Sequence, residues 1–141
     1  MRVREILRSK GDTVYQISPS ASLADVVDRL VKFNCGSLLV AEGDTIIGII
    51  TERDILRASA AHRTHLDQFS VRDHMTRDLV TGHPDDEVSS VMGLMTRHRI
   101  RHLPIMDQGR LAGLISIGDV VKSQFDALAV ENHYLKTYIQ S

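Results

Sequence analysis

Hydrophobic residues in the first half of this chain follow two spacings, and each spacing predicts one kind of secondary structure. Between Leu23 and Leu30 they recur at i, i+3, i+4 and i+7, the spacing of one helix face, after a Ser22–Asp25 pair that is typical of a capping box. The runs SLLV (37–40) and IIGII (46–50) flank AEGD, whose glycine and aspartate suit a tight turn. Continuous apolar runs predict strands covered on both faces. With TVYQIS before them and RDILRASA after them, these segments predict a β-α-β-β-α unit.

The second half of the chain repeats this pattern 65 positions later. GIITERDIL (48–56) matches GLISIGDVV (113–121). The two copies align without a gap from the pair Val14/Leu79 to the pair Arg57/Lys122. DLVTGH predicts the first strand of the second copy, and HLPIM and LAGLI predict the paired strands around DQGR. Asp85 and Asp86 are interpreted as caps of the intervening helix. Two repeats predict two similar packed units of α/β (α+β) class.

Three further segments complete the expected organisation. The region between the copies is polar and predicts one short helix, Val71 to Met75, whose sequence VRDHM resembles VREIL near the N-terminus. We expect repeat 1 over residues 1–66, repeat 2 over 67–130 and a C-terminal helical extension over 131–141. Leu135, Tyr138 and Ile139 lie at helical spacing in that extension, and either a partner chain or the chain itself would cover them.

Composition excludes several classes of protein. Of 141 residues, 43% are hydrophobic and 25% are charged, which indicates a soluble globular domain rather than a disordered chain. The net charge of −1 does not favour nucleic acid as a partner, and the absence of a long apolar run disfavours the membrane. Cys35 is the single cysteine, which fits a reducing compartment. We therefore expect a cytoplasmic protein.

The hydroxyl–carboxylate pairs within the repeated stretch are the main candidates for chemistry. Thr51 with Asp54, and Ser116 with Asp119, stand where a strand ends and a helix begins, so both pairs suit a capping box that needs no ligand. The same arrangement suits a polyhydroxyl or phosphate ligand, because a helix N-terminus presents free N–H groups and a carboxylate accepts from a diol. Local sequence leaves both interpretations open.

Other reactive residues are weaker candidates. His62 and His65, with Asp67 nearby, lack a third metal ligand at a specific spacing, so a solvated linker is the favoured interpretation. Cys35 has no nominated base and is interpreted as a small buried thiol. No catalytic motif is present, and we expect no enzymatic activity.

The duplicated unit and its two signatures, GIITERDIL and GLISIGDVV, resemble a pair of cystathionine-β-synthase (CBS) domains, also called a Bateman module. This resemblance covers about Val3 to Ala129. It implies two β-α-β-β-α repeats related by a pseudo-twofold axis, each with a small mixed sheet packed on helices. It also implies two clefts between the repeats that take AMP, ADP, ATP, NAD or S-adenosylmethionine.

Carried over from the family, the ligand-binding positions fall in both repeats. Thr51–Asp54 and Ser116–Asp119 would hold the riboses. The backbone of Tyr15 to Ile17 and of Val80 to Gly82 would face the adenines, with Ile50 and Ile115 near the bases.

The cations differ between the copies, which implies two unequal sites. Arg53 corresponds to Gly118, while Arg101 and His102 correspond to Gly36 and Ser37. These three cations would meet phosphates.

The resemblance implies a regulatory module that senses an adenine nucleotide, forms a homodimer and passes its signal to a separate effector protein. The alternative is a scaffold that acts through dimerisation with empty clefts. Replacing Asp54 by Asn discriminates between the two, because Asn can still cap a helix but binds a diol less well.

Overall fold

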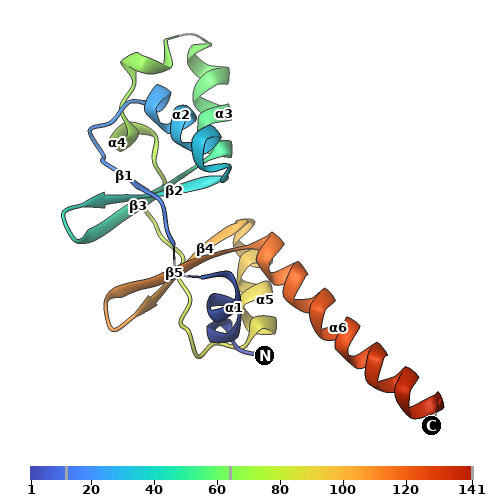
Figure 1. Ribbon diagram of the computed structural model, residues 1–141. Helices are drawn as coiled ribbons and strands as arrows, with labels where there is room; N and C mark the ends of the chain where they lie inside the picture. The colour runs from blue at the N-terminus through green and yellow to red at the C-terminus, as the bar shows by residue number, and fades with distance from the viewer. Residues whose placement is uncertain (12, 64, 141) are drawn as a thin grey trace. The chain divides into compact units, whose positions relative to one another are not determined.

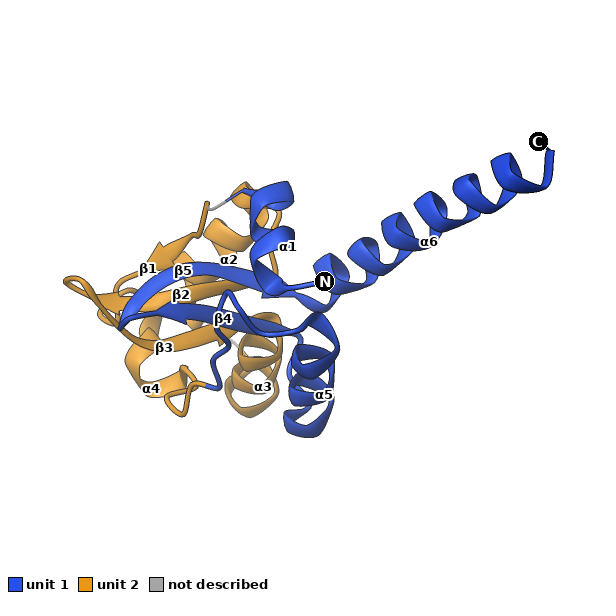
Figure 2. Ribbon diagram, turned by 90° about the horizontal axis from the view of Figure 1, so that it is seen from below, with its two compact units in different colours: residues 1–12, 80–141 blue, residues 13–79 orange. Residues whose placement is uncertain are grey.

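The computed structural model describes residues 1–11, 13–63 and 65–140, and the chain divides into two compact units. One unit is the continuous segment 13–79, and the other combines residues 1–12 with residues 80–141 (Figures 1 and 2). This division by contacts differs from the expected repeat bounds of 1–66 and 67–130, because the N-terminal segment joins the second repeat. The repeat bounds themselves stay a prediction.

The unit of residues 13–79 contains a three-stranded sheet in the order β1-β2-β3. Its elements are β1 (Gln16–Ile17), α2 (Leu23–Phe33), β2 (Ser37–Glu42), β3 (Thr45–Thr51), α3 (Glu52–His62), the 3-10 helix η1 (Leu66–Gln68) and α4 (Val71–His74). β1 and β2 are parallel, and β2 and β3 are antiparallel. The capping box expected at Ser22 and Asp25 is present, and residues 37–40 are all buried, as a strand covered on both faces requires.

The second unit contains α1 (Val3–Lys10), α5 (Val88–His98), β4 (His102–Asp107), β5 (Arg110–Ser116) and α6 (Ile117–Gln140). β4 and β5 form an antiparallel pair joined by a two-residue turn. Gln108 and Gly109 in that turn both have positive φ, as a type I′ hairpin turn demands. The final helix continues without a break to Gln140, and residue 141 of the expected C-terminal extension lies outside the described residues.

The strand expected from DLVTGH is reduced to one bridge, between Gly82 and Ile105. In the other unit, the N–H of Leu39 donates to the carbonyl of Tyr15 at 3.1 Å. The residue 65 positions after Leu39 is Pro104, which has no N–H to donate. The second repeat therefore lacks that ladder hydrogen bond, and a second strand of the first type does not form.

Helix α1 packs on the second repeat rather than on the repeat that follows it in the chain. Its first N–H groups donate to that repeat, Val3 to the carbonyl of Asp86 at 2.9 Å and Arg4 to the carbonyl of Pro84 at 2.8 Å. Val3 and Ile6 are buried in the same core as the strands β4 and β5.

Helix α4 makes the equivalent contacts on the first repeat. Val71 N–H donates to the Ala21 carbonyl at 2.9 Å and Arg72 N–H donates to the Pro19 carbonyl at 3.0 Å. The acceptors lie 65 positions before Asp86 and Pro84, so the resemblance of VREIL to VRDHM reflects the same docking role. Each core is completed by a helix from outside its β-α-β-β-α segment.

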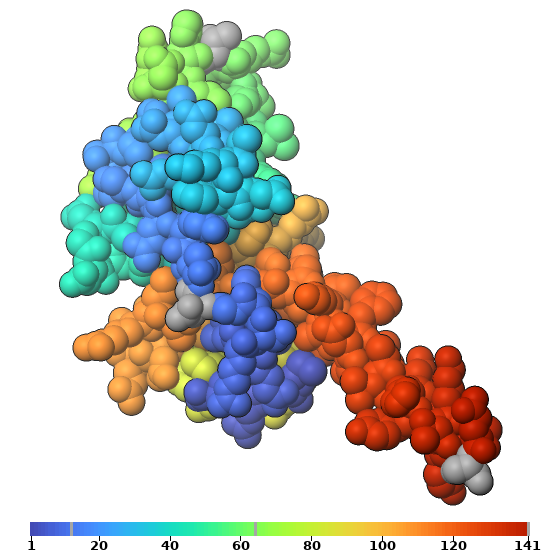
Figure 3. Space-filling model, viewed as in Figure 1, coloured from blue at the N-terminus to red at the C-terminus, as the bar shows by residue number. Residues whose placement is uncertain are grey.

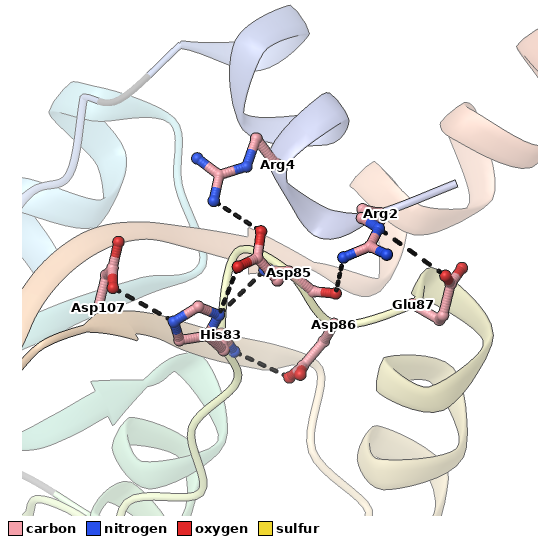
Figure 4. Close-up of polar contacts among 7 residues, drawn as sticks. All are labelled: Arg2, Arg4, His83, Asp85, Asp86, Glu87 and Asp107. Carbon is pink, nitrogen blue, oxygen red and sulfur yellow. Dashed lines mark hydrogen bonds and ion pairs between the residues drawn. The ribbon is translucent and has the colours of Figure 1, made fainter.

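Polar side chains reinforce the docking of α1 (Figure 4). Asp85 accepts from Arg4 at 2.7 Å, and Asp86 accepts from the N–H of His83 at 2.9 Å. The N-cap of α5 is Glu87, and its side chain makes no capping hydrogen bond. The interpretation of Asp85 and Asp86 as caps of that helix was therefore wrong, because Arg4 and the turn at His83 engage these carboxylates instead.

Candidate functional site

The first hydroxyl–carboxylate pair lies where β3 passes into α3. Thr51 is the N-cap of α3, and its Oγ1 accepts from the N–H of Asp54 at 3.4 Å. In return, Oδ2 of Asp54 accepts from the N–H of Thr51 at 2.9 Å. The capping box read from the sequence is confirmed, and Arg53 stands exposed between its two members.

Asp54 is almost fully buried, with 8% of its surface exposed. Besides the backbone, two hydroxyl groups donate to its carboxylate: Thr51 Oγ1 to Oδ2 at 3.3 Å and Thr76 Oγ1 to Oδ1 at 3.4 Å. Both distances are long for an O–H···O hydrogen bond, which is usually about 2.7–2.8 Å. The buried carboxylate is thus held firmly by one N–H and only weakly by two hydroxyls. The sequence did not nominate Thr76, because it lies in the polar region between the repeats.

The side chains at the other positions nominated in this unit pack within it. The Tyr15 ring stacks on Phe33, with centroids 4.0 Å apart. Ile17 and Ile50 are 2% and 0% exposed and belong to the core. Since β2 lies between β1 and β3, the backbone of residues 15–17 and the end of β3 are two strand spacings apart, about 10 Å.

The second pair repeats the capping box in the other unit. Oδ2 of Asp119 accepts from the N–H of Ser116 at 2.8 Å, and the N–H of Asp119 donates to Oγ of Ser116 at 3.1 Å. A cation distinguishes this pair from the first, because Lys10 Nζ lies 2.6 Å from Oδ2 of Asp119 and donates also to the carbonyl of Leu114 at 2.7 Å. Lys10 is the last residue of α1, so its role depends on the docking of α1 and gave no signal in the sequence.

Lys10 also sets the acid–base behaviour of Asp119. Burial acts to raise the pKa of Asp119, but hydrogen bonds from Lys10 and Ser116 and the charge of Lys10 outweigh it and hold the pKa below its ordinary value. A carboxyl with a lowered folded pKa stabilises the fold fully above its unfolded pKa of about 3.9, and this contribution is lost as the pH falls through the folded pKa.

Replacing Lys10 by Met is therefore expected to make the free energy of unfolding depend less on pH in the acid range. At pH 7 the variant should lose no more than about 1 kcal/mol of its free energy of unfolding, because the ion pair is partly exposed. Below pH 4 the difference from the unchanged protein should shrink. Urea unfolding at a series of pH values measures this, with Lys122→Met as the matched loss of charge. An equal effect of the two variants at every pH would contradict the assignment.

Arg101 and His102 lie beside the second pair. The carbonyl of Arg101 accepts from the N–H of Ile117 at 2.9 Å, at the start of α6. His102 is directly opposite Ser116 in the β4–β5 register. Both cations nominated in this repeat thus lie at the strand ends next to the capping box.

The other positions nominated in the second unit make contacts that stabilise its fold. Ile115 is 0% exposed in the core, and Val80 packs against that core. Both backbone groups of Gly82 are used, since its N–H donates to Pro104 and its carbonyl accepts from Met106, each at 2.9 Å.

The weaker candidates acquire structural roles. Burial raises the pKa of the Cys35 thiol, which donates to the carbonyl of Ser37 at 3.6 Å, so this group is poorly suited to act as a nucleophile. The ring of His62 stacks on Phe69 with centroids 3.9 Å apart. Among the described residues, no cluster of three metal-ligating side chains occurs and no helix combines the length and apolarity needed to cross a membrane.

Comparisons with known proteins agree with the fold. The model of the CBS domain matches residues 3–61 and 71–126. The CBS domain-containing protein CBSX3, mitochondrial, of Arabidopsis thaliana is 33% identical over 98% of this chain and 71% of its own length. The crystal structure of the CBS-domain containing protein ATU1752 from Agrobacterium tumefaciens superposes with a TM-score of 0.86 and 35% identity over 88% of this chain and 99% of that one.

A more distant structure shares the fold alone. The CBS domain pair of protein MJ0100, solved in complex with 5′-methylthioadenosine and S-adenosyl-L-methionine, has a TM-score of 0.73 and 24% identity, over 90% of this chain and 98% of that one. The family model matches most of this chain in two consecutive segments, one in each repeat. The chain belongs to the CBS domain family and carries two copies of that domain.

Proposed function

We propose that this chain is a regulatory, non-catalytic module that binds an adenosine-containing nucleotide, with the ribose diol received by Thr51 and Asp54 in the first repeat. The environment of Asp54 carries this proposal. Its two hydroxyl donors lie at 3.3 and 3.4 Å, so a diol that donates at ordinary distance can replace them while the backbone N–H bond keeps the cap intact. AMP, ADP, ATP, NAD and S-adenosylmethionine all carry such a diol.

The second repeat offers a related but weaker diol site at Ser116 and Asp119. Here Lys10 Nζ lies 2.6 Å from Oδ2 of Asp119, the oxygen that also accepts from the N–H of Ser116, so the negative charge of this carboxylate is already paired with a cation. A carboxylate that is paired with a cation attracts a further donor less strongly, because the cation offsets its negative charge. We therefore place the tighter ribose site in the first repeat.

Phosphate groups would be met by cations near the helix N-termini. Arg53 follows Thr51 on α3, and Arg101 and His102 lie beside Ser116. Arginine can pair bidentately with phosphate, and a protonated histidine adds a further positive charge. The unequal cations favour unequal ligands at the two sites.

Binding would regulate by favouring one arrangement of the protein over another, to the extent that the affinities for the two arrangements differ. That MJ0100 binds two adenosine compounds supports the ligand class, although the likeness to it is one of fold. The homodimer, the separate effector protein and the cytoplasmic location expected from the sequence remain predictions.

A thermal-shift panel with AMP, ADP, ATP, NAD and S-adenosylmethionine tests this function. A ligand at 100 times its Kd adds about 2.7 kcal/mol, which raises Tm by several degrees for a chain of this size. Asp54→Asn should keep the helix cap but weaken binding about tenfold or more, because a charged acceptor is lost. Asp119→Asn should have the smaller effect, and Asp44→Asn, in an exposed turn of the same unit, should have none.

The panel also discriminates against the scaffold. No shift with any of the five compounds, on protein shown to be free of bound nucleotide, would leave both pairs as helix caps and favour a scaffold. A shift that survives Asp54→Asn unchanged would place the ribose elsewhere.

A further inference from the structure

The C-terminal part of α6 displays an apolar stripe with no covering element among the described residues. From Gln124 to Gln140 every residue is exposed, and this part of α6 extends away from the other helices and strands of its own unit (Figures 1 to 3). Phe125 is 68% exposed, Leu128 55% and Ile139 79%. A helix of this length in water gains most of its stability by packing an apolar face. Among the described residues of its own unit this stripe has no such packing, which a second helix would supply.

The spacing of the stripe identifies the kind of partner. Its members alternate at intervals of four and three residues, which is the a/d pattern of a heptad repeat. Positions a are Phe125, Asn132 and Ile139, and positions d are Val121, Leu128 and Leu135. Five of these six positions are apolar, and a/d spacing is typical of a helix that packs against another long helix in a coiled coil. The exposed side chains of Val130, Tyr134 and Tyr138 lie at positions f, c and g.

Residue types at these positions favour two parallel strands. Leucine occupies two of the three d positions, and Ile139 is β-branched at a, a combination that favours dimers. Asn132 at a central a position specifies register and dimeric state, because it can pair with the same residue of a second helix.

Charge complementarity points to a second copy of this chain. In a parallel pair, position g of one helix meets position e of the next heptad on the other, so Glu131 would meet Lys136 of the second copy twice, by symmetry. The e positions also include Lys122. An antiparallel pair sets e against e, which would bring these lysines together.

We propose that α6 forms a parallel, in-register, two-stranded coiled coil with α6 of a second copy, centred on Asn132. The inference rests on α6 alone and is independent of nucleotide binding. The coiled coil would join two copies of the module. Its helix, α6, begins directly after Ser116, at the end of β5.

Analytical ultracentrifugation of the full chain tests the seam. The unchanged protein should sediment as a dimer at high micromolar concentration, and Leu128→Glu with Leu135→Glu should sediment as a monomer. The control carries Val130→Glu with Thr137→Glu, which places two charges at the same spacing on the opposite face, and it should stay dimeric. A monomeric unchanged protein, a trimer or tetramer, or a dimer that survives the seam variant would overturn the proposal.

A charge exchange tests the orientation. Glu131→Lys should weaken the dimer about tenfold, because two attractions become repulsions. Adding Lys136→Glu to that variant should restore it. No restoration would overturn the parallel arrangement. Circular dichroism should show that the seam variant keeps its folded units. The nucleotide panel should give the same thermal shift for this variant as for the unchanged protein, so loss of the dimer is distinguished from loss of nucleotide binding.

Discussion

Val3→Asp is expected to destabilise the unit of residues 1–12 and 80–141 by more than about 4 kcal/mol. Val3 has 0% exposure and lies in the core with Val88, Met95 and Leu103. A carboxylate placed there would be buried in an apolar core without a paired cation. Burial of an unpaired charge is among the most destabilising of single changes. The effect is large because α1 supplies two of the core residues of a unit whose sheet has only two strands.

The location of the damage is the informative readout. Hydrogen exchange measured by mass spectrometry should show the first loss of protection in β4, β5 and α5, and a smaller loss in β1, although β1 directly follows α1 in the chain. Arg8→Asp, which adds the same carboxylate at an exposed position of α1, should cost no more than about 1 kcal/mol. A greater loss in β1 to β3 than in β4 and β5 would contradict the docking of α1 on the second repeat.

Gly48→Ala is expected to destabilise the other unit by about 1–3 kcal/mol. A Cβ at Gly48 would lie 2.9 Å from the carbonyl oxygen of Thr76 and 2.8 Å from Sδ of Met75. Thr76 cannot easily retreat, because its backbone is joined to Ile49 by hydrogen bonds of 2.8 and 3.0 Å. The glycine is thus required where the segment after α4 crosses β3, and urea unfolding measures its contribution.

Two other glycines serve as matched controls. At Gly113, the equivalent position of the second repeat, a Cβ would meet only the end of the Leu7 side chain, at 2.6 Å, which can change rotamer. Gly113→Ala should therefore cost less than Gly48→Ala. Gly93 lies inside α5 with nothing within 4 Å of an added Cβ, and Gly93→Ala should stabilise by about 0.5–1 kcal/mol. The reverse order of Gly48 and Gly113 would contradict this account.

Sequence patterns predicted the parts of the fold that depend on local spacing. The helix stripe after Ser22, the paired strands around each turn and both capping boxes are confirmed. The first strand of the second repeat was overestimated, because one proline, Pro104, removes a hydrogen bond that neighbouring apolar residues do not reveal. The partner of α1 was also missed, because docking across the chain leaves no periodicity to read.

The same limit applies to the candidate site. The residue types at Thr51 and Asp54 predicted a helix cap. The same types recur 65 positions later, at Ser116 and Asp119, and predicted a second cap. Their surroundings come from distant segments. Lys10 reaches Asp119 from 109 positions away, and nothing in the local pattern of α1 indicates that contact. The difference between the two carboxylates is therefore a property of the tertiary structure.

The docking of α1 has a consequence for the order in which the chain folds during synthesis. Residues 13–79 are continuous, so that unit can complete its core before the rest of the chain has been made. The other unit needs α1 and also β4 and β5, which are made after residue 79. Since α1 has only eight residues, it is too short to persist as a helix by itself while it waits. We expect the α1 segment, which is made before residues 13–79, to fold after them, and the closing of this long loop to set the folding rate.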